Sequence, residues 1–80
     1  MAVVLKLYVR TGCHLCEDML GQLQQLQPEL GFGLETIEIT GQPSLELEYG
    51  EKVPVLMGQN NEICHYFLDP EALKRYIELQ

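Results

Sequence analysis

The chain has 80 residues and a mass of 9.1 kDa, the size of one domain, so a two-domain enzyme with a cleft between its domains is excluded. Hydrophobic residues make up 46% of the chain, which predicts a folded core rather than a disordered tail. The net charge of −7 at pH 7 repels phosphate backbones and anionic membranes. We therefore expect a single domain over residues 1–80 that binds neither nucleic acid nor membrane.

The compartment follows from the first residues and from the cysteines. Residues 1–10 lack the basic lead and the cleavage site of an export signal, and no stretch approaches the roughly 18 apolar residues of a membrane-spanning helix. We therefore expect a cytoplasmic protein. There, a close pair of cysteines such as Cys13 and Cys16 indicates redox chemistry or metal binding more often than a structural disulfide.

The first half of the chain reads as strand, helix and strand. Residues 2–9 are almost wholly apolar, which predicts a strand buried on both faces of a sheet. Apolar residues at helical spacing predict an amphipathic helix over residues 14–27 that ends at Pro28. Residues 34–40 alternate between apolar and polar, which predicts a half-exposed edge strand. A strand–helix–strand unit of this kind pairs its two strands in parallel.

The second half reads as a short helix, a hairpin and a last helix. Residues 43–49 can form one or two helical turns closed by Gly50. Residues 53–57 and 62–68 flank a cluster of turn-forming residues, the pattern of a β-hairpin with antiparallel strands. Asp69 followed by Pro70 is typical of a helix start, and Leu73, Tyr76 and Ile77 supply the apolar face of that last helix.

The chemistry is expected where the first strand gives way to the first helix, at Cys13 and Cys16. A helix amino terminus presents unpaired N–H groups and a partial positive charge, which stabilise a thiolate and lower the pKa of the first cysteine. We expect Cys13 to be the exposed nucleophile and Cys16, one turn further in, the buried resolving thiol. His14 is either a group that tunes these thiols or an exposed spacer.

Two motifs carry a resemblance to a known family. Thr-Gly-Cys-His-Leu-Cys-Glu over residues 11–17 and Tyr-Gly-Glu-Lys-Val-Pro-Val-Leu over residues 49–56 resemble the thioredoxin fold in its compact glutaredoxin form, above all the small bacterial glutaredoxin-like proteins. The resemblance spans nearly the whole chain. It implies an α/β fold with a four-stranded mixed sheet of order 2-1-3-4 flanked by helices, the last two strands antiparallel to the first two.

The same resemblance implies a function. The protein would be a thiol–disulfide oxidoreductase that reduces mixed disulfides of proteins or of glutathione, is recharged by a thiol reductant, requires no cofactor and acts as a monomer. Pro54 would form a cis peptide bond and pack against Cys13 and Cys16, and the backbone of Val53 would pair with the substrate. Arg10, or the other basic residue near the site, Lys52, would pair with a substrate carboxylate.

The chain also departs from the glutaredoxin pattern. The family's glutathione-binding Gly-Gly-x-Asp segment is replaced by His-Tyr-Phe-Leu-Asp over residues 65–69. His14 and Leu15 stand between the cysteines in place of Pro and Tyr. These two residues join Arg10, Val53 and Pro54 as expected substrate contacts, and glutathione stays one of two candidate co-substrates.

Two alternatives remain open at this point. Cys13, Cys16, Cys64 and either His14 or His65 offer the ligands of a Cys₃His zinc site or of an iron–sulfur cluster shared between two chains. No metal is expected, because Cys64 and His65 are neighbours on a predicted strand and point to opposite faces. Cys64 instead reads as a small buried residue. The other alternative is a non-enzymatic binding module that holds a partner at the edge near Val53.

Overall fold

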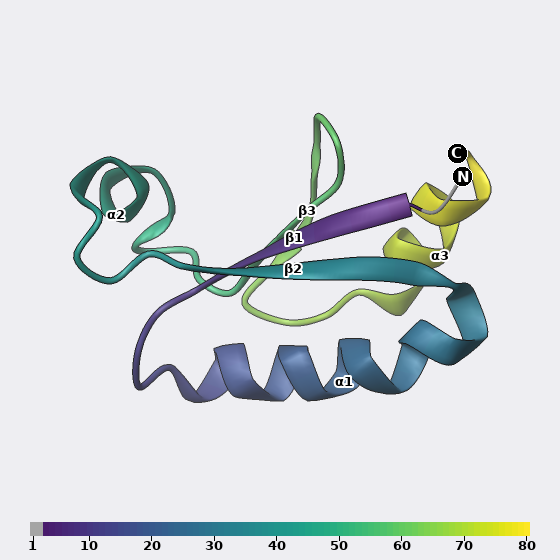
Figure 1. Cartoon of the computed structure of the whole chain (residues 1–80), viewed down its shortest axis with the longest axis horizontal. Helices are drawn as coiled ribbons and strands as arrows, with labels where there is room; N and C mark the ends of the chain where they lie inside the picture. The colour runs from purple at the N-terminus through teal and green to yellow at the C-terminus, as the bar shows by residue number, and fades with distance from the viewer. Residues whose placement is uncertain (1–2) are drawn as a thin grey trace.

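The computed structural model describes residues 3–80, and Ala2, where the predicted first strand begins, lies outside them. The elements occur in the predicted order, and the sheet has the predicted strand order β2-β1-β3-β4 (Figure 1). The bounds are β1 (Val3–Val9), α1 (His14–Leu30), β2 (Phe32–Glu38), α2 (Pro43–Tyr49), β3 (Val55–Met57), β4 (Glu62–His65) and α3 (Pro70–Glu78).

The directions of the strands follow from their pairing. β1 pairs in parallel with β2, where Leu5 lies opposite Leu34, and antiparallel with β3, where Leu7 lies opposite Leu56. β3 and β4 are antiparallel to each other. The expectation that the last two strands both oppose the first two is therefore wrong for β4, because the hairpin turn reverses the chain once more and returns β4 to the direction of β1.

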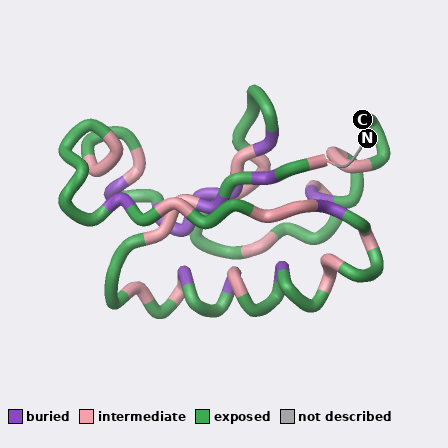
Figure 2. Tube along the Cα trace, in the orientation of Figure 1, coloured by how far each residue is buried: buried purple, intermediate pink, exposed green. Residues whose placement is uncertain are grey.

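The core lies on one face of the sheet, under α1 and α3. Leu5 and Leu7 of β1 are fully buried there, with Leu23 of α1 and Leu73 of α3. On the other face of β1, Val4 is 55% exposed. The predicted burial of β1 on both faces is wrong, because α2 lies past the carboxyl ends of β1 and β2 rather than over this second face (Figures 1 and 2).

The first helix is longer than predicted. Pro28 lies inside α1, which continues to Leu30. Pro28 has no N–H to donate within the helix, and the Gln27 side chain donates to the Phe32 carbonyl at 3.2 Å across the end of the helix. The helix ends at Gly31, whose φ of 70° lies in the left-handed region and whose N–H donates to the Gln27 carbonyl at 2.8 Å. The residue that ends α1 is therefore Gly31, not Pro28.

The strands also differ from their predicted bounds. β2 begins two residues earlier than expected and forms an edge of the sheet, as predicted, with Glu35 and Glu38 exposed. The last predicted strand, over residues 62–68, ends at His65. Tyr66 has a φ of 63°, and its N–H donates to the Pro54 carbonyl at 3.0 Å, so the chain leaves the extended conformation there.

Both short helical predictions are confirmed. α2 occupies residues 43–49 and is followed by Gly50. α3 begins after Asp69, whose carboxylate accepts the Ala72 N–H at 3.1 Å, and Pro70 takes the first helical position.

The packing of α3 against the hairpin leads to a stability prediction. A Cβ added at Gly58 would overlap the Tyr76 ring, whose hydroxyl accepts the Gln59 N–H at 2.7 Å. Gly58→Ala must therefore displace Tyr76, and we expect it to lower the free energy of unfolding by about 1–3 kcal/mol. Gly21→Ala is the matched control, since open space surrounds that position in α1 and alanine favours a helix by about 0.5–1 kcal/mol. Urea denaturation of both variants measures the difference, and equal effects would contradict the prediction.

Candidate functional site

The turn that precedes α1 places Cys13 at the N-cap of the helix. Gly12 has a φ of 74°, which glycine adopts without strain, and the Cys13 N–H donates to the Arg10 carbonyl at 3.2 Å. Cys13 itself is extended, and its sulfur accepts the Cys16 N–H at 3.1 Å. A backbone donor of the first helical turn is therefore directed at the Cys13 sulfur, as the sequence predicts for a helix start.

Cys13 and Cys16 are joined as a disulfide, with their Cα atoms 5.2 Å apart. Cys16 is only 3% exposed, whereas Cys13 is half-buried. The predicted difference in burial between the two cysteines is confirmed. An outside disulfide reaches the Cys13 sulfur more readily than the Cys16 sulfur.

A second apolar cluster surrounds the disulfide, apart from the main core. Cys16 packs there with Ile39 and Val53, all of them buried. Tyr8 and Tyr49 stack at the margin of this cluster with their ring centroids 4.2 Å apart. Burial, with smaller effects from the Tyr8 phenol and the Glu48 carboxylate, raises the pKa of Tyr49 to about 12.

Val53 and Pro54 form the segment that the resemblance assigns to substrate pairing. Their peptide bond is cis, and the Pro54 side chain is fully buried. The Val53 N–H already donates to the Tyr49 carbonyl at 3.1 Å, whereas no backbone N–H within residues 3–80 donates to the Val53 carbonyl. In this structure the carbonyl, and not the amide, of Val53 can pair with an added strand.

The other expected contacts lie in different surroundings. Arg10 is exposed and lines, with Cys13 and Cys16, a small cavity of about 100 Å³. The His14 side chain is 85% exposed, and its Nε2 lies 3.9 Å from the Asp18 carboxylate. The structure thus brings Arg10 to the cysteine pair, whereas His14 lies in solvent beside an acidic residue.

A hydrogen-bond network that holds the loop before Cys13 escapes the sequence reading. The Thr11 hydroxyl donates to the Glu38 carboxylate at the end of β2, and the Thr11 N–H donates to the Thr40 hydroxyl at 3.0 Å. The Gln42 side chain donates to the Glu38 carbonyl at 2.6 Å. Thr11 and Glu38 are 27 residues apart, so only the parallel pairing of β1 with β2 brings them together.

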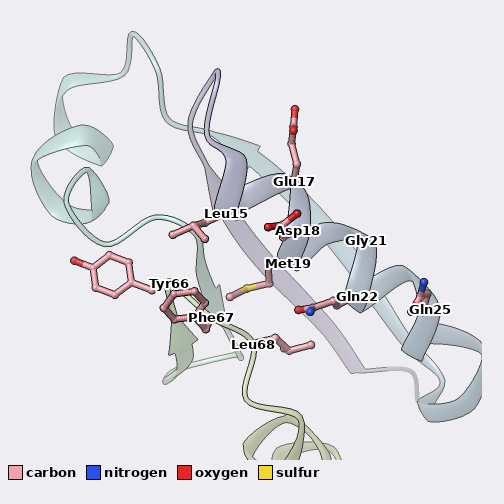
Figure 3. A pocket seen from close by; sticks show the side chains of 10 residues that line it. All are labelled: Leu15, Glu17, Asp18, Met19, Gly21, Gln22, Gln25, Tyr66, Phe67 and Leu68. Atoms are coloured by element: carbon pink, nitrogen blue, oxygen red, sulfur yellow. The ribbon is translucent and has the colours of Figure 1, made fainter.

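A groove opens beside Leu15, the residue between the two cysteines. It has a volume of about 440 Å³ and lies between α1 and the segment of residues 66–68 (Figure 3). The Tyr66 hydroxyl donates to the Glu51 carbonyl at 2.6 Å, which ties this segment to the loop before Pro54. The sequence does not indicate this groove, because its pattern predicts that residues 66–68 form the end of a strand.

The third cysteine lies elsewhere. Cys64 packs against the main core beneath α1 and α3, where burial raises the pKa of its thiol.

Within residues 3–80, no three His, Cys, Asp or Glu side chains are grouped so that they could hold a metal ion. In the same part of the chain, no helix has the length and hydrophobicity needed to cross a membrane.

The network at Glu38 generates a prediction about the loop. Glu38→Ala removes the carboxylate that accepts the Thr11 hydroxyl, so we expect the Thr11 amide hydrogen to exchange with solvent about tenfold faster. Amide exchange followed by NMR measures this rate. Glu35→Ala, on the same strand but outside the network, is the control. Equal exchange in both variants would show that the network does not hold the loop.

The burial of Tyr49 generates a prediction about pH. Its folded-state pKa of about 12 lies above the usual value of 10, so folding favours the neutral phenol. The stability that this preference contributes is present below pH 10 and is lost as the pH rises from 10 to 12. The difference in phenolate absorbance between wild type and Tyr49→Phe should titrate near pH 12. A midpoint near pH 10 would contradict the assigned burial.

Solved structures resemble this chain over almost its full length. A protein of Nitrosomonas europaea, known from a solution NMR structure, is 42% identical, with a TM-score of 0.85 over 95% of this chain and 92% of its own. A protein of Xanthomonas campestris, known from an X-ray structure, is 28% identical, with a TM-score of 0.77 over 95% and 97% of the two chains. Thioredoxin 1 of Thermosipho africanus is 19% identical, with a TM-score of 0.63 over 95% and 96%, which shows a shared fold.

Similar sequences include uncharacterized proteins of Mycobacterium tuberculosis and Mycobacterium bovis. They are 34% identical over 74 residues, which cover 86% of this chain and 76% of theirs. The sequence model of one family, described as glutaredoxin-like domain (DUF836), matches residues 4–78. With its sheet order and its cysteine pair at the start of α1, the chain belongs to this glutaredoxin-like family and has the thioredoxin fold.

Proposed function

We propose that the protein is a thiol–disulfide oxidoreductase in which Cys13 is the nucleophile and Cys16 the resolving thiol. The observation that carries the proposal is the place of Cys13 at the N-cap of α1, where its sulfur accepts the Cys16 N–H at 3.1 Å. In the reduced protein the same N–H, together with the partial positive charge of the helix start, stabilises a Cys13 thiolate.

The reaction transfers two electrons in two exchanges. The Cys13 thiolate attacks one sulfur of a substrate disulfide, so that a Cys13–substrate bond forms, the substrate disulfide breaks and one substrate thiolate leaves. Cys16, having lost its proton to solvent, then attacks the Cys13 sulfur. The Cys13–Cys16 disulfide forms and the second substrate thiolate leaves. A thiol reductant, such as the cytoplasm supplies, restores the two thiols.

The surroundings of the disulfide supply the substrate contacts of the proposal. The Val53 carbonyl accepts a backbone N–H of the substrate, and buried Pro54 holds this carbonyl in place. Arg10, which lines the small cavity at the cysteine pair, receives a carboxylate of the substrate. Leu15, in the neighbouring groove, and the exposed His14 contact the substrate beside the disulfide. The substrate is a disulfide-containing protein or a glutathione mixed disulfide, and the protein acts as a monomer without a bound cofactor.

Cysteine variants test the proposal. Cys13→Ser should abolish reduction of a small disulfide, because the attacking sulfur is lost. Cys16→Ser should accumulate a mixed disulfide at Cys13, seen as an added mass by mass spectrometry. Cys64→Ser is the matched control and should keep full activity, since Cys64 packs in the main core. Full activity in Cys13→Ser would refute the assignment.

A redox titration tests the pair as a unit. Equilibration in glutathione buffers, followed by alkylation of free thiols, should give one cooperative transition of Cys13 and Cys16 between roughly −270 and −180 mV. Raised pKa and burial should make Cys64 react with the alkylating agent far more slowly than Cys13. Independent titration of the two thiols would favour a binding module without redox activity.

A further inference from the structure

The groove beside Leu15 differs in character from the surface around Arg10. The apolar side chains of Leu15, Met19 and Phe67 line it (Figure 3). Phe67 is 70% exposed, and the adjacent Tyr66 is 42% exposed, so two neighbouring aromatic residues reach the surface here. Aromatic side chains are enriched at surfaces that contact a protein partner.

The segment that carries Phe67 is held in place by Tyr66. The φ of 63° at Tyr66 lies in the left-handed region, which is strained for a residue with a side chain, so other contacts must hold it. Two of them are the bonds from the Tyr66 N–H to the Pro54 carbonyl and from its hydroxyl to the Glu51 carbonyl. Because the chain turns there, Phe67 comes to face α1 across the groove and is anchored to the loop that carries Val53.

The charge of the groove is negative. Glu17 and Asp18 of α1 line it, and no lysine or arginine is among its lining side chains in residues 3–80. The Asp18 side chain is 58% exposed and can therefore contact a ligand. Its carboxylate lies 3.9 Å from the Nε2 of the exposed His14. Arg10 lines the smaller cavity at the cysteine pair, which shares only Glu17 with the groove. A carboxylate that entered the groove would therefore meet the like charge of Asp18, with a second like charge nearby on Glu17, whose side chain points away from Phe67 (Figure 3).

We propose that the groove selects the disulfide substrate: a protein segment with an apolar side chain beside its reactive cysteine and a lysine or arginine nearby, in preference to glutathione. The apolar side chain packs between Leu15 and Phe67, and the basic side chain pairs with Glu17 and Asp18. Glutathione carries two carboxylates and one ammonium group, so it opposes the charge of the groove and lacks an apolar side chain. This inference rests on the proposed oxidoreductase function and names its substrate class.

Matched disulfides test the selection. Two peptides with blocked ends each contain a Leu-Cys pair. The basic peptide has a lysine on either side of this pair, and the acidic peptide has glutamates in their place. Each peptide is joined through its cysteine to 2-mercaptoethanol by a disulfide. Glutathione joined to the same thiol and bis(2-hydroxyethyl) disulfide complete the set. Rapid mixing with the fully reduced protein, acid quenching and mass spectrometry give the rate constant of the first exchange without an external reductant.

The expected order places the basic peptide first. At low salt it should react about tenfold faster than the acidic peptide and about tenfold faster than the glutathione disulfide. The difference is the size expected when one or two exposed ion pairs form in place of repulsion between carboxylates. In 1 M salt the charge preference should fall to about twofold, because the Debye length is then about 3 Å. Glutathione that reacts as fast as the basic peptide would overturn the inference.

Variants locate the preference in the groove. Glu17→Gln with Asp18→Asn should lower the ratio of basic to acidic peptide about fivefold, whereas Glu29→Gln with Glu78→Gln removes the same charge elsewhere and should leave the ratio unchanged. Phe67→Ala should lower the rate for the basic peptide about tenfold relative to bis(2-hydroxyethyl) disulfide. Leu47→Ala, at a leucine of α2 that is 90% exposed, should leave this relative rate unchanged. Equal effects from the groove and control variants would overturn the inference.

A binding measurement separates this inference from the proposed function. NMR titration of the oxidised protein with the basic peptide, its cysteine replaced by serine, needs no redox step. Shift changes at Leu15, Glu17 and Phe67 support the groove even if no disulfide is reduced, in which case the oxidoreductase proposal alone fails. Shift changes confined to other surfaces refute the groove, whatever the activity toward bis(2-hydroxyethyl) disulfide.

Discussion

The turn from Arg10 to Cys13 determines where α1 begins, and the arrangement of the site depends on that start. Gly12 in the left-handed region brings the chain round so that the Cys13 sulfur, rather than a hydroxyl or carboxylate, receives a backbone N–H of the first helical turn. Glu38 holds the same loop from the neighbouring strand. The electrostatic support of the sulfur comes from the backbone of the fold, whereas His14, 85% exposed beside Asp18, lies at the periphery.

The disulfide of Cys13 and Cys16 lies outside the main core of this small domain. The disulfide packs in a cluster with Ile39 and Val53, whereas the larger cluster lies beneath α1 and α3 and contains the third cysteine. Val9 of β1 packs against both clusters and joins them. Because Cys64 packs against the main cluster, it lies apart from Cys13 and Cys16.

Most of the fold could be predicted from local patterns. The spacing of Leu15, Met19 and Leu23 marks α1, the Asp69–Pro70 pair marks the start of α3, and the cysteine motif marks the site. The errors arise where distant contacts decide. Val4 is exposed because α2 packs beyond the ends of the strands and not over Val4. The end of β4 depends on the hydrogen bonds of Tyr66 to Glu51 and Pro54.

The position of the two cysteines could be predicted from the sequence, whereas most of the contacts around them could not. Cys13 and Cys16 are close in sequence, so a helix start was enough to predict which of the two is the more buried. The Thr11–Glu38 contact joins two strands, and the groove joins α1 to residues 66–68. The burial of the Val53 amide against Tyr49 likewise depends on the return of the chain from α2. Such contacts leave no periodic signal in the sequence.

The position of β2 at the edge of the sheet has a consequence for the protein at high concentration. An unpaired edge strand exposes N–H and C=O groups that can recruit a second chain and extend the sheet from molecule to molecule. Here the edge carries the exposed carboxylates of Glu35 and Glu38, and each molecule has a net charge of −7. Two copies that approached through this edge would bring like charges together, so the acidic residues of β2 protect the domain against aggregation.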